Sequence, residues 1–419
     1  MKILIKNTHI LNKESKYHNK VNDILIQDGI IQKIANRINE KCDYIINAAH
    51  TYTSIGWVDI FANFCEPGYE HKETIETGIK VAAAGGYTDV FLIPNLIPST
   101  SSKANVEFLK NTQSIVNIHP IGSISNQIAG KELAEMSDMN HAGAIAFSDG
   151  LKPIQNVALL LKALQYVKTF DGIIIEISED SSLAHHGLMN EGIVSTQIGL
   201  QGKPSIAEDI NTFRNIELLN YTQSKLHLTG VSTKKSIEMI RQAKKKNKNL
   251  TCSVTPYHLL YNDSELLNYN SNFKVTPPLR SEEDRKALIK AIQDGTIDCI
   301  ASHHSPQTFD EKQVEFEYAK NGMITLQTML SMLRKTEANI SIEKWVELLS
   351  ENPRKIFKLP KPKIETGQTA ALTIFSTEGK WNFDKRKNKS QSENSPLFQQ
   401  ELTGKVVATI NNHSIFIHE

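Results

Sequence analysis

The chain has 419 residues, with 47 basic and 46 acidic side chains and a formal net charge of +1. This length predicts one large domain of about 250 to 300 residues and a smaller companion. The balanced charge excludes a global field that would attract nucleic acid or an anionic membrane. The four cysteines lack Cys-x-x-Cys spacing, and the N-terminus shows neither a signal peptide nor a membrane span. We therefore expect a cytoplasmic protein with reduced thiols.

The two ends of the chain are rich in short strand patterns. Strands are predicted at 3–5, 22–27, 30–34, 44–47, 370–375 and 404–410, between turns rich in Asn, Asp and Gly. None of these strands is long enough to form an independent sheet. We therefore expect residues 1–52 and 355–419 to share one small, β-sandwich-like domain. The charged segment 385–395 is predicted to be a solvated loop within it.

Between these ends, apolar strands alternate with amphipathic helices. The strands are predicted at 55–60, 87–93, 114–120, 142–147, 172–177, 225–230, 250–255 and 297–302. Helices are predicted at 74–84, 157–168, 207–222, 234–246, 281–293, 324–335 and 342–350, with Asn352 and Pro353 starting a further one. Eight β-branched strands covered on both faces predict an α/β fold with a (β/α)8 TIM barrel over residues 53–354.

The first predicted barrel strand ends in an unusual polar corner. An apolar run reaches Asp59, and the corner closes with Glu66-Pro67-Gly68. The stretch resembles the first barrel strand of the cyclic amidohydrolases, and of dihydroorotases in particular, whose pattern is Asp-x-His-x-His-x-Arg-Glu-Pro-Gly. Here Phe61 and Asn63 stand at the two histidine positions, and Cys65 stands at the arginine position.

The resemblance continues at the ends of the other strands and covers nearly the full length. Ile177 stands where the family has the histidine of His-x-Glu-Asp, and Gly230 stands at the second histidine of His-x-x-His-x-Ser-Thr. His303 replaces the aspartate of Ala-Ser-Asp-His-Ala-Pro-His. In the family these groups hold zinc, and the aspartate is also the general base. One carboxylate of the family pattern, Asp149, is retained.

The residues at the family's metal positions determine whether the chain is expected to bind zinc. Zinc hydrolysis needs at least three protein ligands, and phenylalanine, isoleucine and glycine side chains have no lone pair to donate. With Phe61, Asn63, Ile177, Gly230 and His303 at the family's metal positions, we expect no zinc cofactor and no catalytic residue. The enzyme rival is a metal site rebuilt from Asp149, His303 and His304.

The family resemblance also implies substrate contacts. They are Asn95, which would hold a carboxylate, together with Thr276, Gln307 and Gly322. The alternative for Asn95, Asp149 and His258 is that they satisfy backbone groups, as buried polar residues commonly do.

Three further clusters have a functional and a structural interpretation. Glu179 and Asp180 are an acid and base pair or cap the following loop. The pair His185-His186 is expected in an exposed loop. The run Lys244 to Lys246 is expected to be the solvated end of a helix, where cations favour the dipole, rather than a nucleic-acid patch.

The leading hypothesis is a dihydroorotase-like protein of pyrimidine biosynthesis that has lost catalysis, a pseudoenzyme with a structural or regulatory role. The resemblance implies an aspartate transcarbamoylase-type partner, and a homo-oligomer is equally compatible. Two rivals stay open. One is an active cyclic amidohydrolase with the rebuilt metal site, and the other is a metal-free protein that binds a small carboxylate through Asn95.

Overall fold

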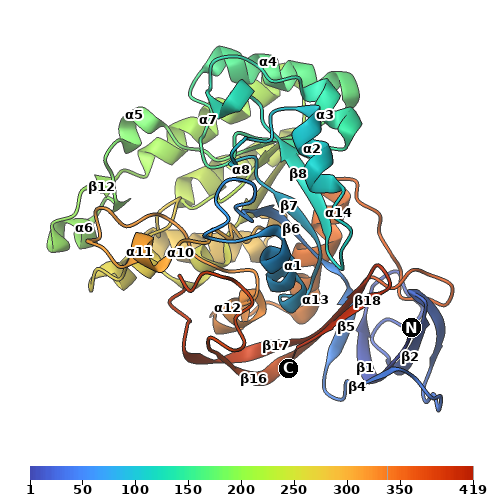
Figure 1. The fold of residues 1–419 in the computed structure, drawn as a ribbon. Helices are drawn as coiled ribbons and strands as arrows, with labels where there is room; N and C mark the ends of the chain where they lie inside the picture. Colours follow the sequence, from blue (N-terminus) through green and yellow to red (C-terminus); the bar gives the residue numbers. More distant parts are fainter. Residues whose placement is uncertain (337, 419) are drawn as a thin grey trace.

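The computed structural model describes residues 1–336 and 338–418. Its larger part is an eight-stranded parallel sheet in the order β15-β14-β13-β10-β9-β8-β7-β6 (Figure 1). The strands are β6 (Trp57–Ala62), β7 (Tyr87–Leu92), β8 (Asn117–Gly122), β9 (Ala146–Phe147), β10 (Ile174–Glu176), β13 (Leu226–Leu228), β14 (Leu250–Val254) and β15 (Cys299–Ile300). The sheet closes on itself because Ala62 bridges to His304 and the Ser302 N–H donates to Asp59 at 2.6 Å. The predicted barrel is confirmed.

Helices follow the strands and cover the outside of the barrel. They are α1 (Ile75–Ala84), α2 (Lys103–Lys110), α3 (Met136–Ala142), α4 (Val157–Val167), α7 (Ile206–Thr222), α8 (Lys234–Lys246), α10 (Glu282–Gln293), α12 (Met329–Lys335), α13 (Ile342–Val346) and α14 (Asn352–Ile356). Several begin at a side-chain cap: Thr233 accepts from the Ser236 N–H, and Ser281 accepts from the Asp284 N–H. Every residue of β6 and β7 is buried, as expected for strands covered on both faces.

Shorter elements occupy the loops between strands and helices. They are α5 (Ser181–Ala184), β11 (Met189–Asn190), α6 (Ile193–Ile198), β12 (Gly202–Lys203), α9 (Pro256–Leu260), α11 (Phe309–Lys312) and single helical turns at Asn126–Ile128, Lys168–Phe170, Asp263–Leu266 and Ser271–Phe273. The strands β11 and β12 pair with each other in a separate parallel sheet.

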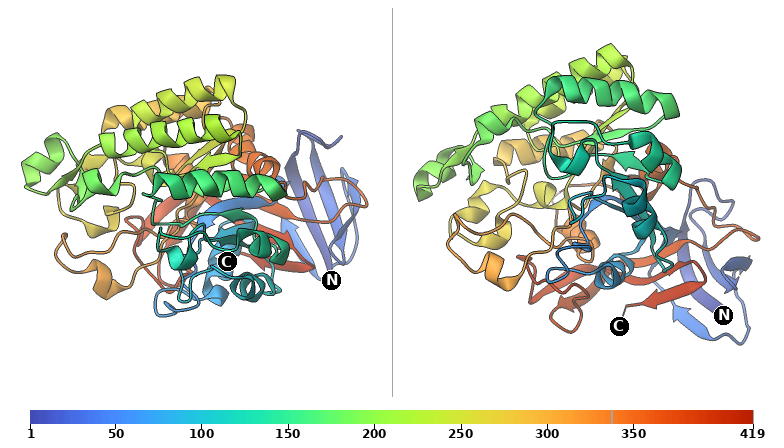
Figure 2. Two further views of the ribbon diagram at one scale, coloured as in Figure 1. Left: turned by 90° about the horizontal axis from the view of Figure 1, so that it is seen from above. Right: turned by 45° about the horizontal axis from the view of Figure 1, so that its top comes forward.

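Both chain ends meet in a second sheet beside the barrel, as predicted (Figures 1 and 2). Its strands are β1 (Lys2–Leu11), β2 (Val21–Gln27), β3 (Ile30–Ala35), β4 (Tyr44–Asn47), β5 (Tyr52–Ile55), β16 (Leu372–Phe383), β17 (Gln400–Asn411) and β18 (Ser414–Ile417). The two chain ends are joined by the antiparallel pairing of β5 with β16, in which Leu372 lies opposite Ile55. An isoleucine-rich core, including Ile3, Ile24 and Ile374, holds this sheet together.

The boundary between the two sheets differs from the prediction. Ile55 was expected in the first barrel strand, but it ends β5 in the terminal sheet, and the barrel begins at Trp57. Gly56 connects β5 of the terminal sheet to β6 of the barrel. A Cβ at this position would come within 2.2 Å of the Thr88 side chain. The structure also contains β5 and β18, which the sequence patterns did not predict.

Two helix predictions were wrong in their limits. The helix expected at 324–335 begins at Met329. The expected new start at Asn352 is wrong, because the helix continues from α13 through a π-helical turn, Glu347–Glu351, into α14. Only Asn352 separates this turn from Pro353, which has no N–H to donate to the turn before it.

Two barrel strands are also displaced from their expected limits. The strand expected at 142–147 is reduced to Ala146–Phe147, since α3 reaches Ala142 and ends at Gly143 with a left-handed φ of 105°. The strand expected at 114–120 runs from Asn117 to Gly122.

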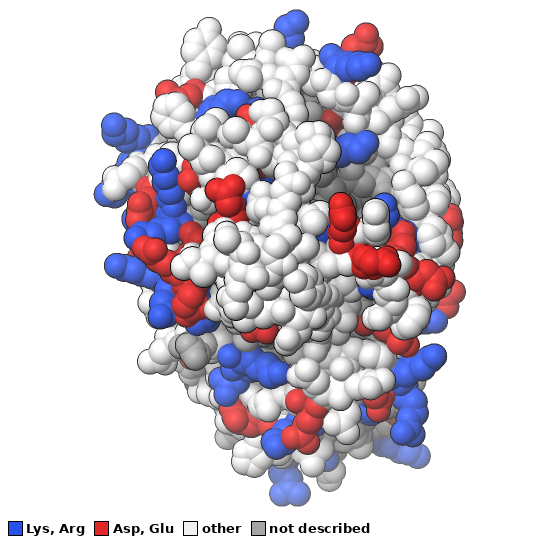
Figure 3. All heavy atoms as spheres, turned by 90° about the vertical axis from the view of Figure 1, so that its left-hand side faces the viewer, with Lys and Arg blue, Asp and Glu red and all other residues white. Residues whose placement is uncertain are grey.

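Figure 3 shows acidic and basic side chains interspersed over one face of the molecule, around a central region of uncharged side chains. This face carries no single-sign field, in keeping with the balanced composition. In the described part of the chain, no helix combines the length and the apolar character needed to cross a lipid bilayer.

Candidate functional site

The carboxyl ends of the barrel strands form a mouth, where a TIM barrel normally carries its active site. Three positions that the sequence analysis singled out meet there. The Phe61 ring stacks on the His303 ring with centroids 4.4 Å apart and planes at 27°. A Cβ on Gly230 would lie 2.7 Å from His303 Cε1, so the imidazole fills the space where a side chain at position 230 would start. Phe61, Gly230 and His303 therefore form one packed unit.

Apolar packing surrounds this unit. Phe61 is 1% exposed and Ile177 is 4% exposed, and both belong to a cluster that includes Ile60, Phe91 and Ile175. Side chains without donor atoms thus occupy the places at which the family resemblance implies metal ligands. Apolar packing therefore holds Phe61 and Ile177 in place at the mouth.

His303 is also the end of a hydrogen-bonded chain along the barrel interior. Its Nε2 lies 2.9 Å from Thr229 Oγ1, and the Ser253 hydroxyl donates to the same Thr229 oxygen at 2.9 Å. His227 Nε2 lies 3.0 Å from Ser253 Oγ, and its Nδ1 lies 2.8 Å from Thr251 Oγ1.

The direction of the Ser253 bond fixes the proton of His227. Because the Ser253 hydroxyl gives its one proton to Thr229, the Ser253 oxygen accepts from His227 Nε2–H. The bond between Thr229 and His303 Nε2 forms with either atom as the donor. Burial lowers the pKa of His227 and of His303 to about 3, so both imidazoles are neutral.

Asn63 and Asp59 contribute to the architecture of the first strand. The Asn63 side chain accepts from the Cys65 N–H at 2.8 Å, and the Asn63 N–H donates to the His304 carbonyl. Asp59 accepts from the N–H and the hydroxyl of Ser302, and burial raises its pKa to about 6. Cys65 remains a thiol, because burial raises its pKa to about 12.

His304 faces a buried glutamate that sequence analysis missed. His304 Nδ1 accepts from the Thr325 N–H, so the neutral ring carries its proton on Nε2, which lies 3.8 Å from Glu73. Glu73 also accepts from the hydroxyls of Thr77 and Ser390. No sequence signal marked Glu73, since it lies in a loop before α1 rather than at a strand end.

The segment 385–395, predicted to be a solvated loop, instead packs over this region. Ser392, Asn394 and Ser395 are buried. The Asn394 side chain donates to the Ser305 carbonyl at 3.0 Å and accepts from the Gln307 N–H at 3.1 Å. The polar composition of the loop therefore serves to satisfy buried groups of the chain, a role that composition alone does not distinguish from solvation.

Asp149 and Asn95 form a second group at the mouth. Asp149 accepts from the N–H groups of Ile124 and Ser125, both at 2.9 Å, and from the Ser125 hydroxyl. Burial raises its pKa. Asn95 donates to the Asp149 carbonyl and accepts from the Leu151 N–H. Both side chains thus satisfy backbone groups, as the structural alternative predicted.

The other expected substrate contacts lie near a different loop. Gln307 accepts from Lys72 Nζ at 2.8 Å and donates to the Asn321 carbonyl. A Cβ on Gly322 would come within 3.0 Å of Gln307, so these two residues are neighbours. Thr276 is half-buried and precedes a cis peptide bond to Pro277. The structure brings Gln307 and Gly322 together, while Asn95 contacts Asp149 instead.

The remaining predicted clusters are structural. Asp180 caps α5 by accepting from the N–H groups of Ser182 and Leu183, as predicted. His258 bonds to Thr255 and to the Pro278 carbonyl. His185 and His186 are exposed, as expected.

The residues at the mouth do not fit the zinc ion that the family resemblance implies. Phe61, Ile177 and Gly230 offer no donor atom. Among residues 1–336 and 338–418, no three His, Cys, Asp or Glu side chains are arranged to hold a metal ion. Asp149, His303 and His304, the proposed members of a rebuilt site, each bond to different partners.

Comparison with solved structures defines the class of fold. The chain superposes on the L-hydantoinase (dihydropyrimidinase) of Arthrobacter aurescens with a TM-score of 0.85 and 21% identity, covering 99% of this chain and 96% of that one. The barrel with a β-rich domain from both termini is therefore the fold of the hydantoinases.

Sequence comparison identifies the family. The dihydro-orotase-like family model matches residues 53–236. A dihydroorotase of Acetivibrio thermocellus is 39% identical over 423 aligned residues, covering 100% of this chain and 99% of the relative. One of Caldicellulosiruptor saccharolyticus is 40% identical over 423 residues, covering 99% and 98%. The chain belongs to the dihydroorotase family.

Proposed function

We propose that this chain is a non-catalytic member of the dihydroorotase family that serves pyrimidine biosynthesis as a structural or regulatory subunit. The observation that carries this proposal is the stack of Phe61 on His303, with Gly230 closed against the same imidazole. The stack fills the place of the reacting centre with groups that neither bind a metal nor activate water.

A partner of the aspartate transcarbamoylase type, or a second copy of the chain, would give such a subunit its role. The outer face of α7 supports a protein partner, because it exposes a row of large apolar side chains at helical spacing. These are Ile206, Ile210, Phe213 and Tyr221, which are 44–74% exposed.

Three measurements on the purified full-length chain test this proposal. Elemental analysis is expected to find less than stoichiometric zinc, and interconversion of carbamoyl-aspartate and dihydroorotate is expected to stay at background. Sedimentation with and without an aspartate transcarbamoylase is expected to reveal an assembly that Phe213→Asp with Tyr221→Asp weakens. Phe309→Asp is the matched control, since Phe309 is 73% exposed and lies outside α7. Metal-dependent turnover would overturn the proposal.

The second candidate function is dihydroorotase activity at a rebuilt centre. Full-length identity of 39% to a dihydroorotase favours it. So does His303 Nδ1, a buried ring nitrogen that has no hydrogen-bond partner among the described residues. This candidate predicts one zinc per chain and turnover that His303→Ala abolishes while His185→Ala, in the exposed loop, leaves it unchanged.

A further inference from the structure

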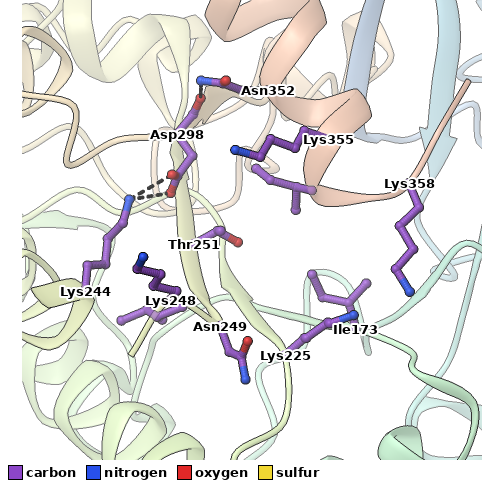
Figure 4. A pocket seen from close by; sticks show the side chains of 12 residues that line it. Ile173, Lys225, Lys244, Lys248, Asn249, Thr251, Asp298, Asn352, Lys355 and Lys358 are labelled. Carbon is purple, nitrogen blue, oxygen red and sulfur yellow. Dashed lines mark hydrogen bonds and ion pairs between the residues drawn. The ribbon is translucent and has the colours of Figure 1, made fainter. Parts of the chain in front are cut away.

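A cavity of about 420 Å³ lies at the end of the barrel opposite the mouth (Figure 4). It is bordered by the amino ends of β10, β13, β14 and β15 and by α14. Its charged lining residues are Lys225, Lys244, Lys248, Lys355, Lys358 and Asp298. This volume is within the range of small-molecule sites, which is about 300 to 1,000 Å³.

The charge of this cavity sets it apart from the rest of the molecule. Five lysines and one aspartate line it, although the whole chain has a formal net charge of only +1. Like charges this close repel one another unless counter-charges compensate them. The cavity therefore concentrates positive potential that the composition does not predict.

Two carboxylates pair with three of the lysines, so that one of these three positive charges has no counter-charge. Lys244 Nζ lies 2.8 Å from both carboxylate oxygens of Asp298 and donates to the Thr296 carbonyl. This corrects the prediction of Lys244 as part of a solvated helix end. Lys225 and Lys358 share the carboxylate of Asp171.

The other two lysines, Lys248 and Lys355, form no ion pair within the described part of the chain. They come from far apart in the sequence, one after α8 and one on α14. In Figure 4 the Lys355 ammonium group points toward Asp298, and the Lys248 ammonium group lies near that of Lys244. Two solvent-exposed lysines without an acidic partner of their own therefore border the same cavity.

Neutral donors complete the lining. The Asn352 amide donates to the Asp298 carbonyl at 2.7 Å, which orients this side of the cavity. Asn249, which directly precedes β14, adds a side-chain amide, whereas the Thr251 hydroxyl is engaged with His227. Lysine ammonium groups together with amides and hydroxyls are the donors that bind phosphate oxygens.

We propose that this cavity is a binding site for a phosphorylated small molecule that carries at least two adjacent phosphoryl groups. Lys248 and Lys355 are the principal ligands, and Lys225 and Lys358 flank them. Five lysines paired with only two carboxylates, Asp298 and Asp171, leave three positive charges without a counter-charge. One phosphoryl group carries at most about two negative charges at neutral pH, whereas two adjacent phosphoryl groups carry about three. The proposal is independent of whether the mouth is catalytic.

Isothermal titration calorimetry of the full-length chain with inorganic pyrophosphate tests this site. At physiological ionic strength we expect one pyrophosphate per chain, and binding weaker by at least about tenfold in the variant Lys248→Gln with Lys355→Gln. The control is Lys103→Gln with Lys380→Gln, which removes the same charge from lysines that are 61% and 66% exposed elsewhere. The affinity of this control variant for pyrophosphate is expected to stay within about twofold of that of the unmodified chain.

Three results would overturn the proposal. They are no heat of binding at millimolar pyrophosphate, an equal loss of affinity in the variant and in its control, and orthophosphate or chloride competing as well as pyrophosphate. The second and third would mean general attraction of anions to a cationic surface. The single variants Lys248→Gln and Lys355→Gln, each expected to bind with intermediate affinity, keep the test decisive if the double variant folds poorly.

Discussion

The two ends of the barrel differ in packing and in charge. At the mouth, Phe61, Ile177 and a neutral His303 pack in a buried apolar cluster. At the opposite end, five lysines line a cavity of about 420 Å³. In TIM-barrel enzymes the carboxyl end normally carries function and the amino end stability. In this chain the packed end is the one where the family has its chemistry, so fold position alone does not locate a ligand site.

The largest expected effect is at the mouth. A variant with Phe61→His, Asn63→His, Ile177→His, Gly230→His and His303→Asp restores the family's metal groups. It is expected to lose at least about 3 kcal/mol of unfolding free energy with a chelator present, because polar groups are buried without partners. Thermal melts measure this, and added zinc is expected to recover part of the loss. A melting temperature no lower than the original would mean that the mouth is open and wet.

One position within that variant has a matched control. Gly230→His places a Cβ 2.7 Å from His303 at a φ of 66°, so crowding and backbone strain both act. Gly199→His has only the backbone strain, since Gly199 has a φ of 71° and nothing within 4 Å of its added Cβ. Equal melting temperatures for the two would show that His303 does not occupy the space beside position 230.

Removing the ring of Phe61 is expected to cost about 3 to 5 kcal/mol of unfolding free energy. Phe61→Ala leaves a cavity beside His303 and removes the stack at 4.4 Å. Phe309→Ala, at a side chain that is 73% exposed, is expected to change stability by less than about 0.5 kcal/mol. Chemical denaturation of both variants gives the two values. A loss at Phe61 as small as that at Phe309 would contradict a packed mouth.

The next effect is a pH dependence at the end of β10. Burial raises the pKa of Glu176 to about 8 from an unperturbed 4.5, while its carboxyl accepts from the Ile154 N–H at 2.7 Å. The neutral form therefore contributes stability that is complete below pH 4.5 and is lost as the pH rises through about 8.

Glutamine at position 176 keeps an acceptor for Ile154 but does not ionise. The melting temperature of Glu176→Gln is therefore expected to fall less between pH 5 and 9 than that of the unmodified chain. Glu378→Gln, at a side chain that is 77% exposed, is expected to leave the profile as it was. If melting temperature depended on pH in the same way in Glu176→Gln and in the unmodified chain, the pKa of Glu176 would not be raised by folding.

The smallest expected effect is at the lysine cavity. Lys248→Gln with Lys355→Gln is expected to change the free energy of unfolding by less than about 0.5 kcal/mol, with any change a gain at low salt, because like charges are removed. Melts at low and high salt measure this. A large loss would mean that the two lysines hold the barrel together, and would weaken the contrast between its two ends.

The sequence determined the architecture and the replaced residues at the mouth. The alternation of apolar strands with amphipathic helices has a local physical cause, since each segment must bury one face, and it predicted the barrel. Ordered motifs then placed Phe61, Ile177 and Gly230 at strand ends. Their lack of donor atoms is a property of the residues themselves and required no coordinates.

The sequence also carries a weaker signal for the polar barrel interior. Polar residues alternate along two neighbouring strands, His227 with Thr229 and Thr251 with Ser253. A period of two puts each pair on one face of its strand. The pattern thus indicated polar groups facing the barrel interior, although not the hydrogen-bonded chain that they form with His303.

Tertiary structure alone decided which residues meet. The stack of His303 on Phe61, the docking of Ser390 on Glu73 and the lining of one cavity by Lys248 and Lys355 join segments separated by 107 to 317 residues. Contacts of this kind depend on how strands and loops pack in three dimensions, and neither composition nor periodicity encodes them locally. For this reason the sequence predicted what the mouth lacks, while only the folded chain revealed what fills the mouth and where the cationic cavity lies.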